Sequence, residues 1–222
     1  MPTLVELTPA ERARLLGKPE GELGVVLGKV MNENNAQVIE AAYRRLGLQT
    51  GHSVLEIGFG NGHTVPLLMN QAEALNYVGI DISETMVAEA TSFNQPLIDA
   101  GRAAFHFAAA GSLPCADASV DRAVAVNVIY FWPDPVHELS EIRRVLRPDG
   151  MSVIAATDAV SAAAYPFARA EFGFHARDAD ALIALHRQAG FSAVTVEPFD
   201  DMGRRPDGTT FARHYHFVVA RL

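Results

Sequence analysis

The chain has 222 residues, of which 49% are hydrophobic and 20% are charged, and it carries a formal net charge of −8. This length suits one α/β domain with small additions, and this composition excludes disordered and fibrous proteins. The negative charge disfavours nucleic acid as a partner, because an acidic protein and a polyanion repel each other.

The first predicted elements lie near the amino terminus. Residues 36–46 have helical spacing, and a glycine-bearing segment, residues 21–35, precedes them. We predict that residues 1–35 form a lid or cap segment and that residues 36–222 form a single domain. The glycines of the lid would permit movement, and Met31 would offer an adaptable apolar contact.

A strand, a turn and a helix follow in order. Residues 53–57 predict a buried strand, residues 58–62 a glycine-rich turn, and a helix is expected to run to about residue 71. Residues 77–80 predict a second strand that ends at Asp81. Ser83 then has the side chain of a helix cap, which predicts a helix from residue 84 to about residue 97.

The rest of the chain continues this alternation. Strands are predicted over residues 104–109, 122–128, 151–156, 192–196 and 212–219, and helices over 135–146 and 178–188, with an irregular aromatic-rich stretch over 164–175. The last two strands should be antiparallel, because the turn-rich segment 199–208 is too short for a helical crossover. The pattern predicts a Rossmann-like α/β fold: a seven-stranded, mostly parallel sheet with helices on both faces and an antiparallel C-terminal strand.

The glycine turn and Asp81 point to a nucleoside-containing ligand. A tight glycine turn after the first parallel strand lets the backbone approach a ligand closely, and a carboxylate about 20 residues later can accept both hydroxyls of a ribose. The dinucleotide fingerprint G-x-G-x-x-G places its third glycine where this chain has His63, whereas Gly62 falls one residue earlier. The pattern is therefore G-x-G-x-G, although a dinucleotide fold would also place an acid after its second strand.

Three motifs in order resemble class I S-adenosylmethionine-dependent methyltransferases, in particular the small-molecule members of the type 11 methyltransferase domain. Residues 54–62 resemble motif I of that family, residues 113–121 resemble its L-P-x-x-D-x-S-x-D run, and residues 141–150 resemble its E-x-x-R-V-L-K-P-G-G run. The resemblance covers about residues 53–156 and implies that the chain binds S-adenosylmethionine, releases S-adenosylhomocysteine and methylates a small-molecule acceptor.

The resemblance also implies roles for individual residues. Glu56 would orient the turn or the methionine ammonium group, and Asp81 would bind the ribose. The other implied cofactor-binding residues are Gly58, Gly60, Asn61 and Gly62 around the methionine part, Ile82 and Met86 along the adenine, Gly111 and Ser112 at the adenine border, and Asn127 beside the methionine part. Many members carry an acid where this chain has Ala109, which puts adenine recognition by a carboxylate in doubt. Met86 could instead belong to the core, and Asn127 could merely cap a turn.

Candidate residues of the acceptor pocket lie in three segments expected to overhang the strand ends. They are Met31, Asn32, Tyr130, Trp132, Tyr165 and His175. Their aromatic rings could surround a cation, or they could simply close the core. His137 and His175 are conceivable bases, but neither is assigned, and the catalytic residue stays unknown, because methyl transfer from a sulfonium can proceed by positioning alone.

Other expectations concern location, metals and competing functions. No window approaches the roughly 20 apolar residues of a membrane span, and residues 1–14 carry charges where a signal peptide needs an apolar run, so we expect a cytoplasmic protein. Cys115 is interpreted as structural or incidental. His214 and His216 lack an evident third ligand, and no metal is predicted. The alternatives are a non-catalytic S-adenosylmethionine-binding protein and a nicotinamide-dependent oxidoreductase.

Overall fold

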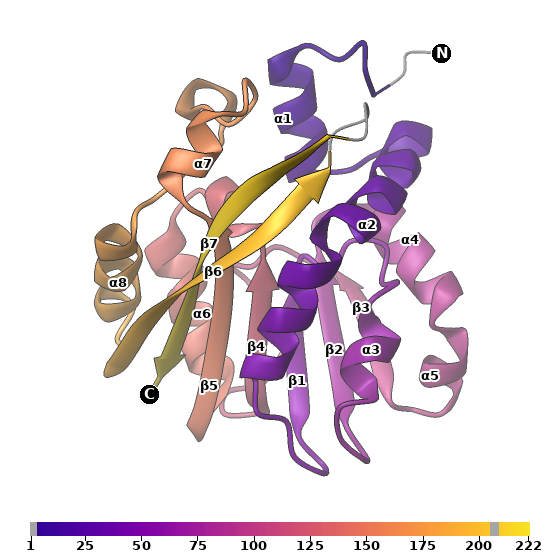
Figure 1. Ribbon diagram of the computed structural model, residues 1–222. Helices are drawn as coiled ribbons and strands as arrows, with labels where there is room; N and C mark the ends of the chain where they lie inside the picture. Colours follow the sequence, from indigo (N-terminus) through magenta and orange to yellow (C-terminus); the bar gives the residue numbers. More distant parts are fainter. Residues whose placement is uncertain (1–3, 205–208) are drawn as a thin grey trace.

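The computed structural model describes residues 4–204 and 209–222 and shows one twisted seven-stranded sheet (Figure 1). Across the sheet the strands follow the order β3-β2-β1-β4-β5-β7-β6. Their bounds are β1 Ser53–Ile57, β2 Asn76–Asp81, β3 Ala103–Phe107, β4 Val120–Val126, β5 Leu146–Thr157, β6 Ala193–Arg204 and β7 Thr210–Arg221.

Strands β1 to β5 are parallel, so their carboxyl ends meet at one edge of the sheet. Strand β7 runs antiparallel to both of its neighbours, β5 and β6. The predicted fold class is confirmed, including the antiparallel strand near the carboxyl terminus. Ligand sites of open parallel sheets lie beyond the carboxyl ends of the strands, so a ligand site is expected at that edge.

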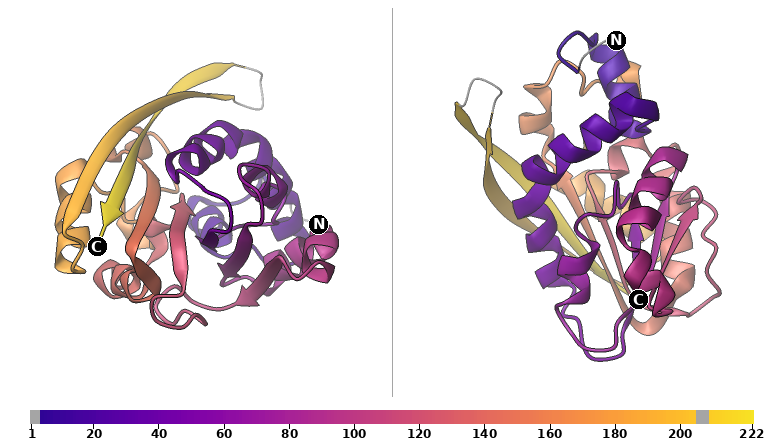
Figure 2. Two further views of the ribbon diagram at one scale, coloured as in Figure 1. Left: turned by 90° about the horizontal axis from the view of Figure 1, so that it is seen from below. Right: turned by 90° about the vertical axis from the view of Figure 1, so that its right-hand side faces the viewer.

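Helices cover both faces of the sheet, as Figures 1 and 2 show. Helices α2 (Gly21–Arg45) and α3 (Val65–Met69) pack on one face, where Val38, Leu68 and Phe217 belong to a single buried cluster. Helices α6 (Pro135–Val145) and α8 (Ala179–Gln188) pack on the other face, where Leu139 and Leu182 join a second cluster. The helices are α1 Pro9–Gly17, α2 Gly21–Arg45, α3 Val65–Met69, α4 Glu84–Phe93, α5 Gln95–Asp99, α6 Pro135–Val145, α7 Ala159–Ala163 and α8 Ala179–Gln188, with single 3-10 turns η1 Ile129–Phe131 and η2 Ala170–Phe172.

Helix α2 begins much earlier than the sequence pattern indicates. The predicted helix covered residues 36–46, whereas the structure has one continuous helix over Gly21–Arg45. Glycine weakens a helix interior, but Gly24, Leu27 and Gly28 are buried, so packing overrides propensity here. The predicted boundary at residue 35 therefore lies inside a helix, and the lid assignment stays a prediction.

Two helices are shorter than predicted. The helix expected to run from residue 84 to about residue 97 ends at Phe93, and α5 starts two residues later. The buried amide of Asn94 donates to the carbonyls of Gly62 and Ala90, and Pro96 lies in the first turn of α5. The helix after the glycine turn spans only Val65–Met69 instead of reaching residue 71.

The last two strands are longer than predicted. Residues 199–204 belong to β6 instead of a turn, and the rest of the predicted turn, residues 205–208, lies outside the described residues. The long β6–β7 hairpin rises past the carboxyl ends of the sheet, on the side where α1 and α7 also lie (Figure 2). Within residues 4–204 and 209–222, no helix has the length and apolar character needed to cross a bilayer.

Candidate functional site

The glycine turn after β1 contains three residues in the left-handed region. Gly58, Gly60 and Gly62 have φ angles of 73°, 62° and 69°. A Cβ on Gly58 would lie 2.3 Å from Val128 Cγ1, and one on Gly62 would lie 2.6 Å from Ala90 Cβ, so both glycines are needed for packing. A Cβ on Gly60 would meet nothing within 4 Å. The backbone at Gly60 is thus open to a ligand.

Asp81 ends β2 beside this turn and is buried, with 7% of its surface exposed. Its Oδ2 accepts a hydrogen bond from the Gly60 N–H at 3.2 Å, and its Oδ1 accepts one from the Ser83 N–H at 2.9 Å. Burial raises the pKa of Asp81 to about 6, against the lowering effect of these backbone donors. The carboxylate is therefore fixed next to the open face of Gly60. This arrangement fits the ribose of a nucleoside.

Glu56 lies below the turn and contacts two tyrosines. Its carboxylate accepts hydrogen bonds from the hydroxyls of Tyr43, on α2, and Tyr77, on β2, each at 2.8 Å. The Tyr43 hydroxyl also lies 3.0 Å from Thr64 Oγ1. Burial raises the pKa of Glu56 to about 7. Glu56 thus joins α2, β1 and β2 under the turn, while a contact with a methionine ammonium group stays a prediction.

The residues expected along the adenine differ in exposure. Ile82 is 39% exposed, whereas Met86 is fully buried, and a Cβ on Gly28 of α2 would lie 3.5 Å from its sulfur. Met86 therefore packs between α4 and α2, which favours the core interpretation. Ser112 is exposed, and the carbonyl of Gly111 lies 2.9 Å from His137 Nε2. This contact gives His137 a role in holding the turn after β3.

Asn127 follows β4 at the carboxyl edge of the sheet and has φ of 59°, the left-handed conformation. Its Oδ1 accepts a hydrogen bond from the Tyr130 hydroxyl at 2.8 Å, and its Nδ2 donates to Asn35 Oδ1 at 3.4 Å. Few residues other than glycine adopt this backbone conformation, although asparagine tolerates it better than most. The structure brings Asn127 to the edge that also carries Asp81, as the sequence predicted for the end of β4.

The predicted acceptor-pocket residues lie at this edge but are mostly covered. Tyr130 and Trp132 belong to the buried core, and the Tyr130 ring stacks on Phe174 with centroids 4.2 Å apart. Tyr165 is half-buried and stacks on Phe167, and His175 is exposed. Met31 and Asn32 are half-buried on α2. The burial of Tyr130 and Trp132 favours the interpretation that these rings close the core.

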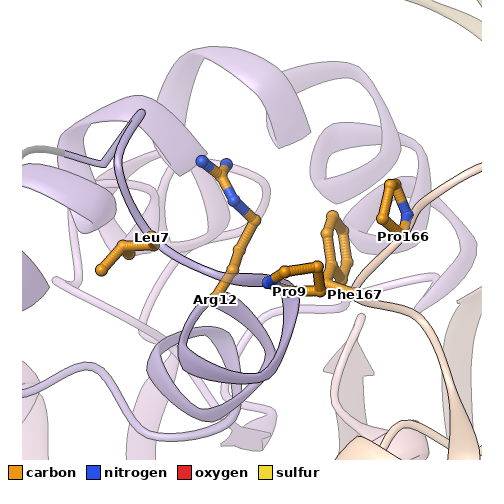
Figure 3. A pocket seen from close by; sticks show the side chains of 5 residues that line it. All are labelled: Leu7, Pro9, Arg12, Pro166 and Phe167. Atoms are coloured by element: carbon orange, nitrogen blue, oxygen red, sulfur yellow. The ribbon is translucent and has the colours of Figure 1, made fainter.

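A cavity of about 260 Å³ lies between α1 and the stretch before η2 (Figure 3). Its lining residues are Leu7, Pro9, Arg12, Pro166 and Phe167. The ring contacts of Phe167 with Phe174, and of Phe174 with Tyr130, connect this cavity to Asn127. The α1 side of this cavity was not predicted, although Thr8 and Glu11 form a capping box at the start of α1 that is visible in the sequence.

A second missed feature is a buried ion pair within the hairpin, whose arginine also donates a hydrogen bond to α2. Arg213 on β7 donates to both carboxylate oxygens of Asp201 on β6, at 2.7 and 2.6 Å, and also to the carbonyl of Asn34 at 2.6 Å. Both charged side chains are almost completely buried. No local pattern could indicate this contact, because Asn34 and Arg213 are 179 residues apart in the chain. Among the described residues, no group of three or more histidine, cysteine, aspartate or glutamate side chains could hold a metal ion.

The fold and this edge define a Rossmann-like protein whose glycine turn and buried Asp81 lie at the carboxyl ends of β1 and β2. Comparison with known proteins narrows the class. A family model described as a methyltransferase domain matches residues 55–154. The O-methyltransferase rstn1 of Aspergillus nomiae is 32% identical over 164 residues, which cover 71% of this chain and 72% of that protein. The chain therefore belongs to the S-adenosylmethionine-dependent class I methyltransferase family.

Two solved structures show the same fold. One is a chain in the complex between the Haloferax volcanii Trm112 methyltransferase activator and a methyltransferase, with a TM-score of 0.70, 20% identity, and coverage of 88% of this chain and 94% of that one. The other is the phosphoethanolamine N-methyltransferase 2 of Haemonchus contortus in complex with S-adenosyl-L-methionine, with a TM-score of 0.66, 18% identity, and coverage of 84% and 52%. The chain spans 42%, 49% and 56% of the length of three other O-methyltransferases that it matches.

Proposed function

We propose that this chain transfers the methyl group of S-adenosylmethionine to a small-molecule acceptor. The observation that carries the proposal is the open backbone at Gly60, whose N–H is bonded to the buried carboxylate of Asp81. The family membership supports the cofactor, and the relative rstn1, named an O-methyltransferase, favours an oxygen atom as the acceptor.

When bound, S-adenosylmethionine supplies an already activated methyl carbon, so the protein mainly has to align the acceptor and exclude water. Asp81 would accept the ribose hydroxyls, and the turn at Gly60 would let the rest of the cofactor approach the backbone. Helix α2 covers the turn, because Gly28 packs against Asn61 and Met86. The cavity beside Arg12 would admit an acceptor from the side of α1.

The first experiment measures cofactor binding by calorimetry with S-adenosylhomocysteine and with NAD. We expect S-adenosylhomocysteine to bind and NAD not to bind, since the G-x-G-x-G turn offers no evident pyrophosphate cradle. Asp81→Ala should weaken S-adenosylhomocysteine binding by about tenfold or more, because charge-assisted hydrogen bonds to the ribose are lost. Tight NAD binding, or an unchanged dissociation constant in folded Asp81→Ala, would contradict the assignment.

The second experiment tests catalysis. A panel of phenols, carboxylic acids, amines and thiols is incubated with S-adenosylmethionine, and the products are read by mass spectrometry for the gain of one methyl group. Methylation of a hydroxyl-bearing acceptor is the expected result. Tight cofactor binding without turnover on any acceptor class would instead favour a non-catalytic S-adenosylmethionine-binding protein.

A further inference from the structure

A chain of hydrogen bonds connects the carboxyl ends of β4 and β5 to helix α2. The Thr157 N–H, at the end of β5, donates to the Tyr130 hydroxyl, which donates in turn to Asn127 Oδ1. The Asn127 Nδ2 then donates to Asn35 Oδ1 on α2. The backbone N–H of Thr157 can only donate, so it fixes the direction of every bond in this chain. Burial raises the pKa of Tyr130, which keeps its hydroxyl protonated and able to donate.

Asn35 lies between the part of α2 that packs on the sheet and the part that lies over the glycine turn. After it, Val38, Ala41 and Ala42 pack on the sheet. Before it, residues 21–33 overhang the glycine turn: a Cβ on Gly28 would lie 3.3 Å from Asn61 Nδ2, and the Gly21 N–H donates to Thr85 Oγ1 at 3.0 Å. Neither of these contacts involves Asn127. The polar contact at Asn35 lies just after the overhanging half of α2, residues 21–33.

Asn127 has an unusual backbone conformation for a residue other than glycine. Its left-handed conformation is one that glycine would adopt without strain. An asparagine at this position keeps the strain but gains an amide that joins Tyr130 to Asn35. The bond to Asn35, at 3.4 Å, is longer than the usual range of about 2.7–3.2 Å and can shorten if α2 moves closer.

We propose that Asn127 and Tyr130 are positioning residues that dock the overhanging half of α2, residues 21–33, over the cofactor turn through Asn35. This inference rests on the proposed function and adds to it the residues that close the site. Neither residue needs to touch the reacting atoms. Their effect on the cofactor is exerted through the position of α2.

The experiment compares three variants of the full chain with wild type. Asn127→Gly keeps the left-handed backbone and removes the amide, Asn35→Ala removes the acceptor on α2, and Asn35→Asp restores an acceptor oxygen. We measure the S-adenosylhomocysteine dissociation constant, the amide hydrogen exchange of residues 21–33 and the melting temperature. Asn34→Ala is the matched control, since only the backbone carbonyl of Asn34 has a described hydrogen bond to the hairpin.

Asn127→Gly and Asn35→Ala should each bind S-adenosylhomocysteine about tenfold more weakly and exchange residues 21–33 several-fold faster. Their melting temperatures should stay equal or rise, because glycine suits the left-handed backbone and alanine suits a helix. Asn35→Asp should recover binding, and the control should match wild type. A purely structural role would move stability and binding in the same direction.

Wild-type exchange and binding in Asn127→Gly and Asn35→Ala would overturn the proposal. Failure of wild type to bind S-adenosylhomocysteine would reject the proposed function alone, because the exchange of residues 21–33 without ligand still tests the docking. Tyr130→Phe, which removes the central hydroxyl, should reproduce the exchange change of Asn127→Gly.

Discussion

Glu56 combines complete burial with a charge that changes near neutral pH. Burial raises its pKa from an ordinary value of 4.5 to about 7, while the hydroxyls of Tyr43 and Tyr77 favour the charged form. A carboxyl group with a raised pKa in the folded state holds its proton more tightly there than in the unfolded chain. The stability that Glu56 contributes is therefore complete below about pH 4.5 and is lost as the pH rises through about 7.

Replacing Glu56 should remove this dependence of stability on pH. Relative to Glu56→Gln, wild type should lose on the order of 3 kcal/mol of unfolding free energy between about pH 4.5 and about pH 7. Urea unfolding of both proteins at several pH values gives the difference, which cancels the contribution of other titrating groups. Parallel pH curves for the two proteins would show that Glu56 keeps an ordinary pKa.

Gly60 and Gly62 of the turn should respond differently to the same substitution. Gly60→Ala places a methyl group in open space, so it should cost only the left-handed backbone, roughly 1–2 kcal/mol, and should weaken S-adenosylhomocysteine binding by about tenfold or more. Gly62→Ala adds a clash with Ala90, so its cost should reach roughly 2–5 kcal/mol.

Thermal melting and calorimetry on the two variants separate these effects. Gly60→Ala is expected to fold and to bind poorly, while Gly62→Ala is expected to lose stability first. If Gly60→Ala bound S-adenosylhomocysteine like wild type, the open face of the turn would not be where the cofactor approaches.

At the scale of elements, the two helices at the amino terminus are the part that sequence patterns describe least well. Glycines in residues 21–35 indicated a flexible lead-in, yet the structure contains a helix there, in which Gly28 packs closely against Asn61 and Met86. Helix α4 ends early for a similar reason, since the Asn94 amide bonds to the turn. In both cases the helix contacts the turn, which is distant in sequence, and no local pattern indicates such a contact.

A truncation tests whether residues 1–35 form a lid. Deleting residues 1–32 should leave a cooperatively melting core, because Val38, Ala41 and Tyr43 still pack on the sheet. The melting temperature should fall, since buried Ala13, Leu15 and Leu27 are lost, and S-adenosylhomocysteine should dissociate more readily.

Leu27→Asp provides a second variant that detaches the amino-terminal segment from the rest of the protein without shortening the chain. Loss of cooperative melting in the truncation would favour a structural role for this segment. A folded truncation with undiminished cofactor binding would exclude a lid.

At the scale of the whole molecule, the order of strands and helices could be predicted because hydrophobic periodicity and glycine turns are local signals. The glycine turn and Asp81 could be placed together for the same reason, since both follow neighbouring parallel strands. The contacts that shape the other side of the site could not be predicted from the sequence. Arg213 with Asn34, and Asn127 with Asn35, join residues 179 and 92 positions apart, and no local pattern marks such pairs.

The position of β7 between β5 and β6 has a consequence for synthesis on the ribosome. Strand β6 leaves the ribosome before β7, but it joins the sheet through β7. Until β7 has emerged, the open edge of β5 has no partner on that side and residues 193–204 have no strand to pair with. The nascent chain can therefore assemble the parallel part of the sheet early, but it exposes two unpaired strand edges that other nascent chains could pair with. Arg213 also belongs to β7, so its hydrogen bond to the Asn34 carbonyl of α2 forms among the last contacts of the molecule.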